Sequence, residues 1–115
     1  MIAVTDPAPV DTALSALADP LRRRTVELLA TPPLRAGELA SALGVTPPTM
    51  SKHLRILRQG GLVTHTPPSF DTRVRIYRLC QEPFGDLRRW LEDTEQGWRE
   101  QLDAFAAHVR SHHEP

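Results

Sequence analysis

The stretch of sequence that decides the fold is VTPPTMSKHLRILRQGGLV, which spans residues 45–63. If residues 47–59 form a helix, the apolar side chains of Met50, Leu54 and Leu57 fall on one face, at the spacing i, i+4 and i+7. The opposite face is polar and basic, with Pro48, Lys52, Arg55 and Gln59 at its centre and Thr49 and Ser51 beside them. The pattern predicts an amphipathic helix that packs by one face and offers a cationic face to solvent.

Both ends of this helix are marked in the sequence. The hydroxyl of Thr46 can accept a hydrogen bond from the free amides of the first turn, and Pro47 suits the first helical position. Gly60 and Gly61 mark the end, because glycine adopts the left-handed backbone conformation that other residues resist.

A second short helix is expected just before it, over residues 36–43. Its inward residues are Leu39, Ala40 and Leu43, and Gly44 supplies a tight turn between the two helices. Two short helices joined by a glycine turn, the second one cationic, are typical of a helix-turn-helix, whose second helix enters the major groove of DNA.

The segments SKHLRILRQGGLV (51–63) and ALADPLRRRTVELL (16–29) resemble the ArsR-type winged helix-turn-helix repressors. The resemblance is specific to these motifs and extends over most of the chain, from about Leu14 to Val109. It implies a dimeric repressor whose DNA-docking helix carries the serine, lysine and histidine at positions 51–53.

The net charge of zero hides a strong separation of charge along the chain. Residues 1–20 carry −3, residues 21–80 carry +7 from ten basic and three acidic side chains, and residues 81–115 carry −4. The basic segment is the one that contains the helix-turn-helix. A local positive field attracts polyphosphate whatever the molecular average, so the distribution favours DNA as a partner.

Length and composition indicate a single domain of 115 residues with an ordinary apolar content of 40%. A core of this size is modest, so dimerisation is expected to help stability. No apolar run approaches the roughly 20 residues that span a membrane, and no secretory signal is visible at the N-terminus. One cysteine, Cys80, cannot form an internal disulfide. We therefore expect a cytoplasmic protein without a cofactor.

The N-terminal region is expected to begin with a flexible tail over residues 1–10 and a short helix over residues 11–18. Leu14 and Leu17 are predicted to point inward on this helix. Residues 11–115 then form the DNA-binding domain.

The next helix is expected to begin at Asp19 as N-cap and Pro20 as first residue and to run to about Ala30. Thr25 lies on its inner face where the resembled family has a larger aliphatic residue, so looser packing is expected there. The arginines at 22–24 cover the other face, either as a solvated cationic surface or as phosphate contacts.

Residues 62–66 and 74–79 are rich in β-branched side chains and predict two strands of a hairpin, the wing. Residues 67–73 connect them in a loop longer than a two-residue turn. Arg73 and Arg75 lie at or beside its tip, where an arginine can reach a minor groove or a phosphate. The alternative is that both are simply exposed on the ribbon.

The last helix is expected over residues 83–112 and carries four of the six aromatic residues of the chain. Its apolar stripe has too little of its own domain to cover it, so we expect the first and last helices to form a two-fold dimer. Packing of the last helix on the first within one chain is the alternative. The predicted interface consists of Leu14, Leu17, Phe84, Leu87, Leu91, Trp98, Leu102, Phe105 and Val109.

Two groups of DNA contacts are predicted. The candidates for base contacts are Thr49, Ser51, Lys52 and His53, although His53 lies between the two faces and can equally be a packed structural histidine. The candidates for backbone contacts are Arg55, Arg58, Arg73 and Arg75.

Metal binding and catalysis find little support in the sequence. The thiolate site of the resembled family uses two cysteines at positions that are Ala40 and Ala42 here, and Cys80 alone is too few for a soft-metal site. His108 and His112 are helical neighbours and are only weak candidates for metal ligands. No nucleophile–base pair or phosphate-binding glycine loop stands out, so no enzyme is expected.

The sequence therefore predicts a mostly helical winged helix-turn-helix: four helices, a β-hairpin and a fifth helix. The expected function is a homodimeric repressor that binds an imperfect palindromic operator. Two alternatives stay open: a winged helix that binds only proteins, and a metal-responsive repressor that uses the terminal histidines. The operator, the regulated genes and any effector cannot be named from the sequence.

Overall fold

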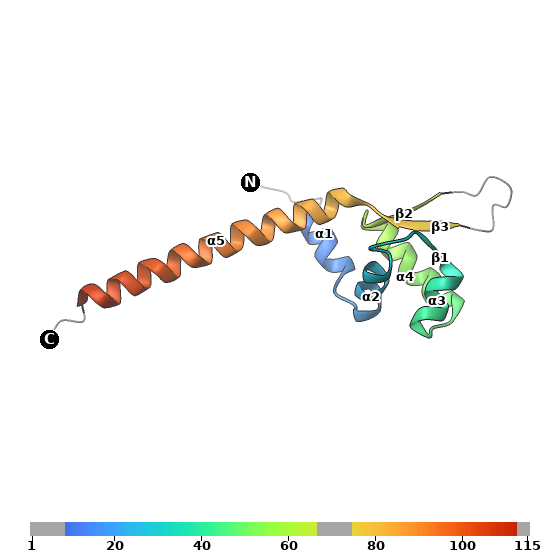
Figure 1. Cartoon of the computed structure of the whole chain (residues 1–115), viewed down its shortest axis with the longest axis horizontal. Coiled ribbons are helices and arrows are strands. Elements are labelled where there is room, and N and C mark those ends of the chain that lie inside the picture. The colour runs from blue at the N-terminus through green and yellow to red at the C-terminus, as the bar shows by residue number, and fades with distance from the viewer. Residues whose placement is uncertain (1–8, 67–74, 113–115) are drawn as a thin grey trace, which may run out of the picture.

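The computed structural model describes residues 9–66 and 75–112 and confirms the predicted fold class. The chain forms five helices and a small antiparallel sheet; the first four helices lie near the sheet, and the last extends far from the remainder (Figure 1). In chain order the elements are α1 (Pro9–Ala16), α2 (Pro20–Leu28), β1 (Leu34–Arg35), α3 (Ala36–Leu43), α4 (Pro47–Gln59), β2 (Val63–Thr66), β3 (Ile76–Leu79) and α5 (Gln81–His112).

The sheet contains a strand that the sequence pattern did not predict. Strand β1 pairs antiparallel with β3, with Leu34 opposite Tyr77 and Arg35 opposite Ile76, so the order is β1-β3-β2. A two-residue strand carries no period-two pattern, and only the arrival of β3 beside it provides its hydrogen-bond partners. The expected β2–β3 hairpin is present, with Val63 opposite Leu79.

Helix α4 has the predicted bounds, and its apolar face is buried. The side chains of Met50, Leu54 and Leu57 are at most 1% exposed. At the start of the helix the Thr46 hydroxyl accepts a hydrogen bond from the amide of Thr49 at 3.4 Å. At the end of the helix, only Gly61 of the two predicted glycines adopts the left-handed conformation.

The left-handed turn after α4 falls at Gly61, whose φ is +77°, whereas Gly60 keeps a helical φ of −78°. Between α3 and α4 the turn is at Gly44, with φ +67° and ψ +34°, as predicted. Helix α3 therefore ends and α4 restarts within three residues, which is the tight connection of a helix-turn-helix.

Helix α1 packs through alanines, which corrects the predicted inward orientation of Leu14. Ala13 and Ala16 are buried, whereas Leu14 is 41% exposed and Leu17 is only half-buried. The reason is the short distance between α1 and the end of α4: a Cβ on Gly60 would lie 3.3 Å from the Cβ of Ala16. Only small side chains permit such an approach, so Leu14 is turned outward, whereas Leu17, just after the helix, packs against the core.

Several predicted helix ends move by two residues. Helix α1 begins at Pro9 and ends at Ala16, and α2 ends at Leu28. Helix α5 begins at Gln81, which places Pro83 in its first turn, where the missing N–H of proline costs nothing. Terminal residues of helices are the least determined part of any sequence pattern.

Thr25 on α2 is fully buried although the resembled family prefers a larger aliphatic residue there. Its Oγ1 donates a hydrogen bond to the carbonyl oxygen of Leu21 at 2.8 Å. The hydroxyl therefore has a partner inside the core.

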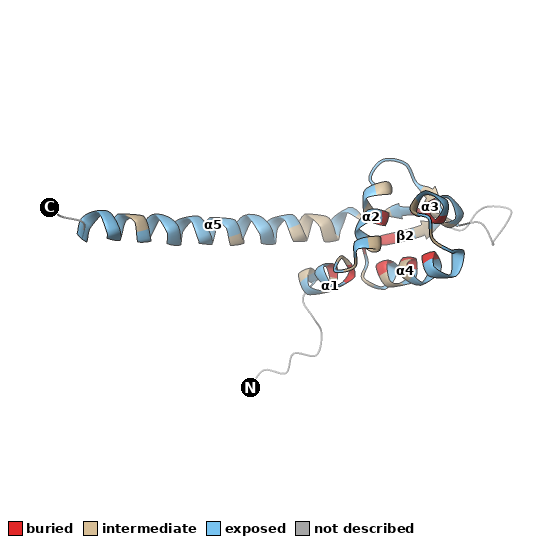
Figure 2. Ribbon diagram, turned by 90° about the horizontal axis from the view of Figure 1, so that it is seen from below, coloured by how far each residue is buried: buried red, intermediate tan, exposed pale blue. Residues whose placement is uncertain are grey.

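Helix α5 leaves the end of β3 and runs away from α2, α3 and α4 (Figure 1). Its 32 residues correspond to a length of roughly 48 Å at about 1.5 Å per residue. Helix α1 packs against it, yet none of the residues of α5 is buried (Figure 2). Among the described residues, no helix is both long enough and apolar enough to span a bilayer.

Candidate nucleic-acid interface

The outer face of α4 is an exposed polar surface of the helix-turn-helix. Thr49, Ser51, Lys52 and Arg55 are exposed, while the opposite face of the same helix lies in the core (Figure 2). The capping bond at Thr46 anchors the first turn, so this face begins at a well-defined helix start. The structure therefore gathers three of the four predicted base-contact residues on one exposed surface.

His53, the fourth of these residues, is half-buried and faces α2. Its Nδ1 lies 3.2 Å from Nη1 of Arg22. A guanidinium only donates hydrogen bonds, so Nδ1 of His53 is the acceptor in this contact. The contact favours the structural alternative for His53, and its predicted base contact stays untested.

Two of the three consecutive arginines on α2 hold the α1–α2 connection. Nε of Arg22 donates to the carbonyl oxygen of Ala16 at 2.5 Å, and Nη1 of Arg23 donates to that of Leu17 at 2.7 Å. These carbonyls lie at the end of α1, where helical partners are missing. Sequence reasoning missed this role because it depends on how α2 folds back on α1.

Arg58 and Arg55 differ in their surroundings although both are exposed on α4. Nη1 of Arg58 lies 2.6 Å from Nε2 of His65 on β2. The ring of His65 contacts the ring of Tyr77 edge-on, with centroids 5.4 Å apart. Arg58 thus joins α4 to the base of the wing, a connection that the sequence did not reveal.

The predicted tip of the wing lies outside the described residues. This applies to Arg73 and to the whole 67–73 connection. Arg75 is exposed immediately before β3. The prediction that these arginines reach DNA stays a prediction.

The predicted dimer residues, which lie on α5 and in the α1 region, divide into a half-buried and an exposed group; Leu17 belongs to the first. Phe84 and Leu87 in the first turns are half-buried, and Phe84 packs against the core of its own chain. The residues beyond them are exposed, with Trp98 at 61% and Phe105 at 65%. The exposed group consists of Leu14, Leu91, Trp98, Leu102, Phe105 and Val109.

The weak metal candidates stack on one another near the end of α5. The rings of His108 and His112 have centroids 4.1 Å apart, and Nδ1 of His112 lies 2.9 Å from the carbonyl oxygen of His108. Within residues 9–66 and 75–112, no three side chains of His, Cys, Asp or Glu gather as a metal site. Cys80 is half-buried at the end of β3.

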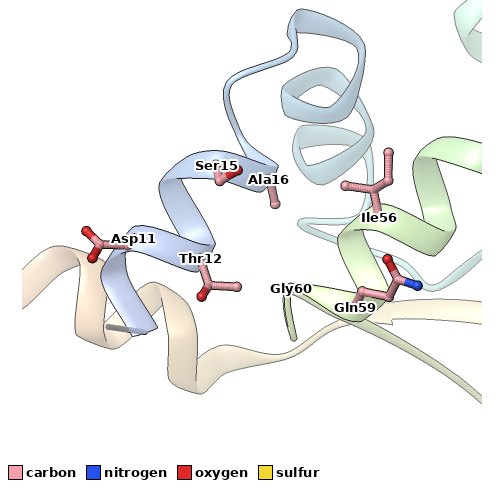
Figure 3. A pocket seen from close by; sticks show the side chains of 7 residues that line it. All are labelled: Asp11, Thr12, Ser15, Ala16, Ile56, Gln59 and Gly60. Carbon is pink, nitrogen blue, oxygen red and sulfur yellow. The ribbon is translucent and has the colours of Figure 1, made fainter. Parts of the chain in front are cut away.

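A hollow of about 450 Å³ lies between α1 and the last turn of α4 (Figure 3). Ala16 and Ile56 are apolar residues that line it, and Asp11, Thr12 and Gln59 are polar ones. Ala16 and Gly60, which approach each other closely, both line the hollow, so it adjoins the C-terminal end of α4. No sequence motif predicted it, because its two walls are 40 residues apart.

An exposed basic helix, a tight turn to the preceding helix and a following β-hairpin define a winged helix-turn-helix protein. Residues 17–66 match the family model described as a helix-turn-helix domain. The HTH-type transcriptional regulator Rv2034 of Mycobacterium tuberculosis is 40% identical over 101 residues, which cover 88% of this chain and 89% of that protein. The chain belongs to the ArsR-type winged helix-turn-helix transcriptional regulators.

Solved structures agree with this assignment. An ArsR-like transcriptional regulator from Rhodococcus sp. RHA1 has a TM-score of 0.72 and 27% identity, covering 84% of this chain and 89% of that one. The homodimeric winged helix-turn-helix DNA-binding domain of Mb0332 from Mycobacterium bovis has a TM-score of 0.58 and 26% identity. The match to Mb0332 covers 93% of this chain and 88% of that chain.

Proposed function

We propose that the protein is a homodimeric transcriptional repressor that binds an imperfect palindromic DNA operator. The observation that carries this proposal is the division of α4 into a fully buried apolar face and an exposed face that bears Lys52, Arg55 and Arg58. An α-helix is about 10–12 Å wide and fits a major groove of about 12 Å. Bound there, the protein would exclude other proteins from a promoter.

The exposed face supports a division of labour among its residues. The ammonium group of Lys52 can donate to the O6 and N7 atoms of guanine, and the hydroxyls of Thr49 and Ser51 can bond several base edges. The guanidinium of Arg55 is better placed on phosphates, which position the protein without reading sequence.

Homodimerisation is supported by the exposed stripe on α5. Trp98, Leu102 and Phe105 are all about 60% exposed in the single chain. Aromatic side chains bury on the order of 150–250 Å² each when covered, so a second copy on this stripe removes a large apolar surface from water. Leu14 on α1 adds to the same interface, and the relative Mb0332 is described as homodimeric.

Two alternatives compete with this proposal. A winged helix that binds only proteins would have no need for three cationic side chains on the exposed face of α4. A metal-responsive repressor would rest on His108 and His112, two ligands where a protein site usually needs three or four. The expectations of a cytoplasmic location and of no enzymatic activity stay predictions that follow from the proposed binding to DNA.

Fluorescence anisotropy tests the proposal. The purified protein is titrated against duplex DNA from the region upstream of its own gene and against a scrambled duplex, each at several salt concentrations. We expect a preference of roughly a thousandfold and a log–log salt slope of about −5 to −10. Absence of binding at low salt would refute the repressor function and favour the protein-binding alternative.

Two variants test the division of labour on the same duplexes. Lys52→Ala should cost about 1–3 kcal/mol on the preferred sequence and relax discrimination. Arg55→Ala should weaken binding to both duplexes alike and make the salt slope about one unit shallower. Equal losses on both duplexes for both variants would contradict these roles.

A further inference from the structure

The hydrogen bond between Arg58 and His65 is a junction between α4 and the first strand of the wing. Nη1 of Arg58 lies 2.6 Å from Nε2 of His65, and the two residues come from different elements. A guanidinium has five N–H donors and no acceptor, so Nε2 must accept. The ring of His65 is therefore neutral in this contact and carries its proton on Nδ1.

The ring is held from the other side by the sheet. Tyr77 on β3 meets it edge-on at 5.4 Å with an interplanar angle of 65°. Nδ1 of His65 is buried and, within the described part of the chain, has no hydrogen-bond partner. The imidazole is thus fixed in one orientation, with its single acceptor directed at Arg58.

If α4 binds DNA, the sugar–phosphate backbone of the DNA would run close to this junction. If α4 occupies a major groove and the wing reaches the neighbouring minor groove, the sugar–phosphate chain that separates the two grooves runs between them. Arg58 lies at that place, tied at one N–H and with four N–H donors left for phosphate oxygens.

We propose that His65 is a positioning residue for DNA binding, which holds the guanidinium of Arg58 in place for a phosphate contact. This inference rests on the proposed function. A neutral imidazole acceptor can hold the guanidinium of Arg58 in one orientation and leave its positive charge available for a phosphate. A carboxylate at the same position would form an ion pair and compete with the phosphate.

Protonation of His65 would remove the contact. The charged groups that face its ring are Arg58 from α4 and Arg75 from the segment before β3, and Tyr77 is the neutral neighbour. Burial, followed by the charges of Arg58 and Arg75, lowers the pKa of His65 below its ordinary value of 6.5. The neutral ring is therefore the form present at pH 7, and acidification below that value converts the only acceptor into a donor.

The test is a double-mutant cycle on the preferred duplex at pH 7.5. The variants are His65→Phe, which keeps an aromatic ring against Tyr77 but removes the acceptor, Arg58→Gln, and the two combined. We expect each single variant to weaken binding about tenfold and the double variant to be no weaker than Arg58→Gln alone. Additive losses would overturn the positioning role.

His65→Gln keeps the inference testable if the phenylalanine variant folds poorly. Glutamine offers a carbonyl acceptor that does not titrate, so it should retain most of the affinity at pH 7.5 and lose less than wild type at pH 5.5. His108→Gln, on the exposed end of α5, is the matched control and should keep the wild-type pH profile. A wild-type pH profile in His65→Gln would overturn the inference.

Nitrogen-15 NMR of the histidines separates this inference from the proposed function. We expect the proton of His65 on Nδ1 at pH 7.5 and a higher pKa for His65 in Arg58→Gln; a proton on Nε2 would refute the contact itself. If wild-type protein binds no DNA, the proposed function fails and the positioning role with it. If wild type binds and the cycle is additive, only the positioning role fails.

Discussion

Nη1 of Arg22 lies 3.2 Å from Nδ1 of His53, so an arginine of α2 is hydrogen-bonded to a histidine of the DNA-docking helix 31 residues further along the chain. The same guanidinium also donates, through Nε, to the carbonyl oxygen of Ala16 at the end of α1. One side chain therefore connects α1, α2 and α4. It fixes the orientation of α4 relative to the helices that surround it.

Replacing Arg22 should destabilise the protein more than replacing its exposed neighbour. Arg22→Ala removes two charge-assisted hydrogen bonds, and we expect the free energy of unfolding to fall by about 1.5–3 kcal/mol in urea titrations. Arg24 is exposed and makes no hydrogen bond to any described residue, so Arg24→Ala should change stability by less than about 0.5 kcal/mol. Equal effects of the two substitutions would contradict the connecting role of Arg22.

Asp19 at the start of α2 should make stability depend on pH in the acid range. Its carboxylate accepts from the amides of Leu21 at 2.8 Å and Arg22 at 3.3 Å. Desolvation alone raises the pKa of Asp19, but those two backbone N–H groups and then the charges of His53 and Arg22 lower it below the ordinary 3.8. The charged form is thus favoured in the folded protein.

A group whose pKa is lowered by folding stabilises the protein above its unfolded pKa and loses this effect as the pH falls through the folded value. Asp19→Asn keeps an N-cap acceptor but cannot ionise. We expect wild type to have the higher urea midpoint at pH 6 and the difference to shrink below about pH 4. A difference between the two proteins that stays constant from pH 6 to pH 3 would exclude a role for the charge.

Two glycines should respond in opposite ways to the addition of one methyl group. Gly44 has a φ of +67°, so Gly44→Ala forces an L residue into the left-handed region at a cost of about 1–2 kcal/mol. Gly37 lies within α3 with open space around its Cβ position, so Gly37→Ala should stabilise by about 0.5–1 kcal/mol. Thermal unfolding of both variants measures the difference, and a destabilised Gly37→Ala would argue against the helical environment.

The exposed stripe on α5 should control the oligomeric state. Trp98→Glu places a charge in the proposed interface, and we expect light scattering to report a mass close to the 12.9 kDa of one chain instead of twice that value. Gln96→Glu adds the same charge on the opposite face of the helix and should leave the dimer intact. A wild-type mass of one chain at micromolar concentration would refute the proposed dimer.

The elements that local sequence determines were predicted well. Helix α4 has the predicted bounds because its cap, its first proline and its terminal glycines are all local signals, and its stripe of Met50, Leu54 and Leu57 is buried as expected. The turn at Gly44 follows from the same kind of signal. In contrast, the predicted inward orientation of Leu14 is wrong, since the apolar pattern of an eight-residue helix does not say which face is inward.

The candidate site was predicted only as a list of exposed polar residues on one helix. The roles of Arg22, His53, Arg58 and His65 became visible when distant segments came together. Each of these contacts joins two elements, and the polar partners have no fixed spacing in the sequence. The strand β1 was missed for the same reason, because its hydrogen bonds come from β3, about 40 residues later.

The sequence by itself determined the helix-turn-helix, the cationic outer face of α4 and the apolar stripe of α5, because helical periodicity and capping act within a few residues. Only the tertiary structure decided which arginines bind other parts of the chain: Arg22 contacts His53 and a helix-end carbonyl, and Arg58 contacts His65. Hydrogen bonds form between atoms that packing brings within about 3 Å, and residue type alone does not specify that geometry. Basic residues of similar type therefore have different roles: Arg22 is structural, and Lys52, Arg55 and Arg58 are, as we propose, DNA contacts.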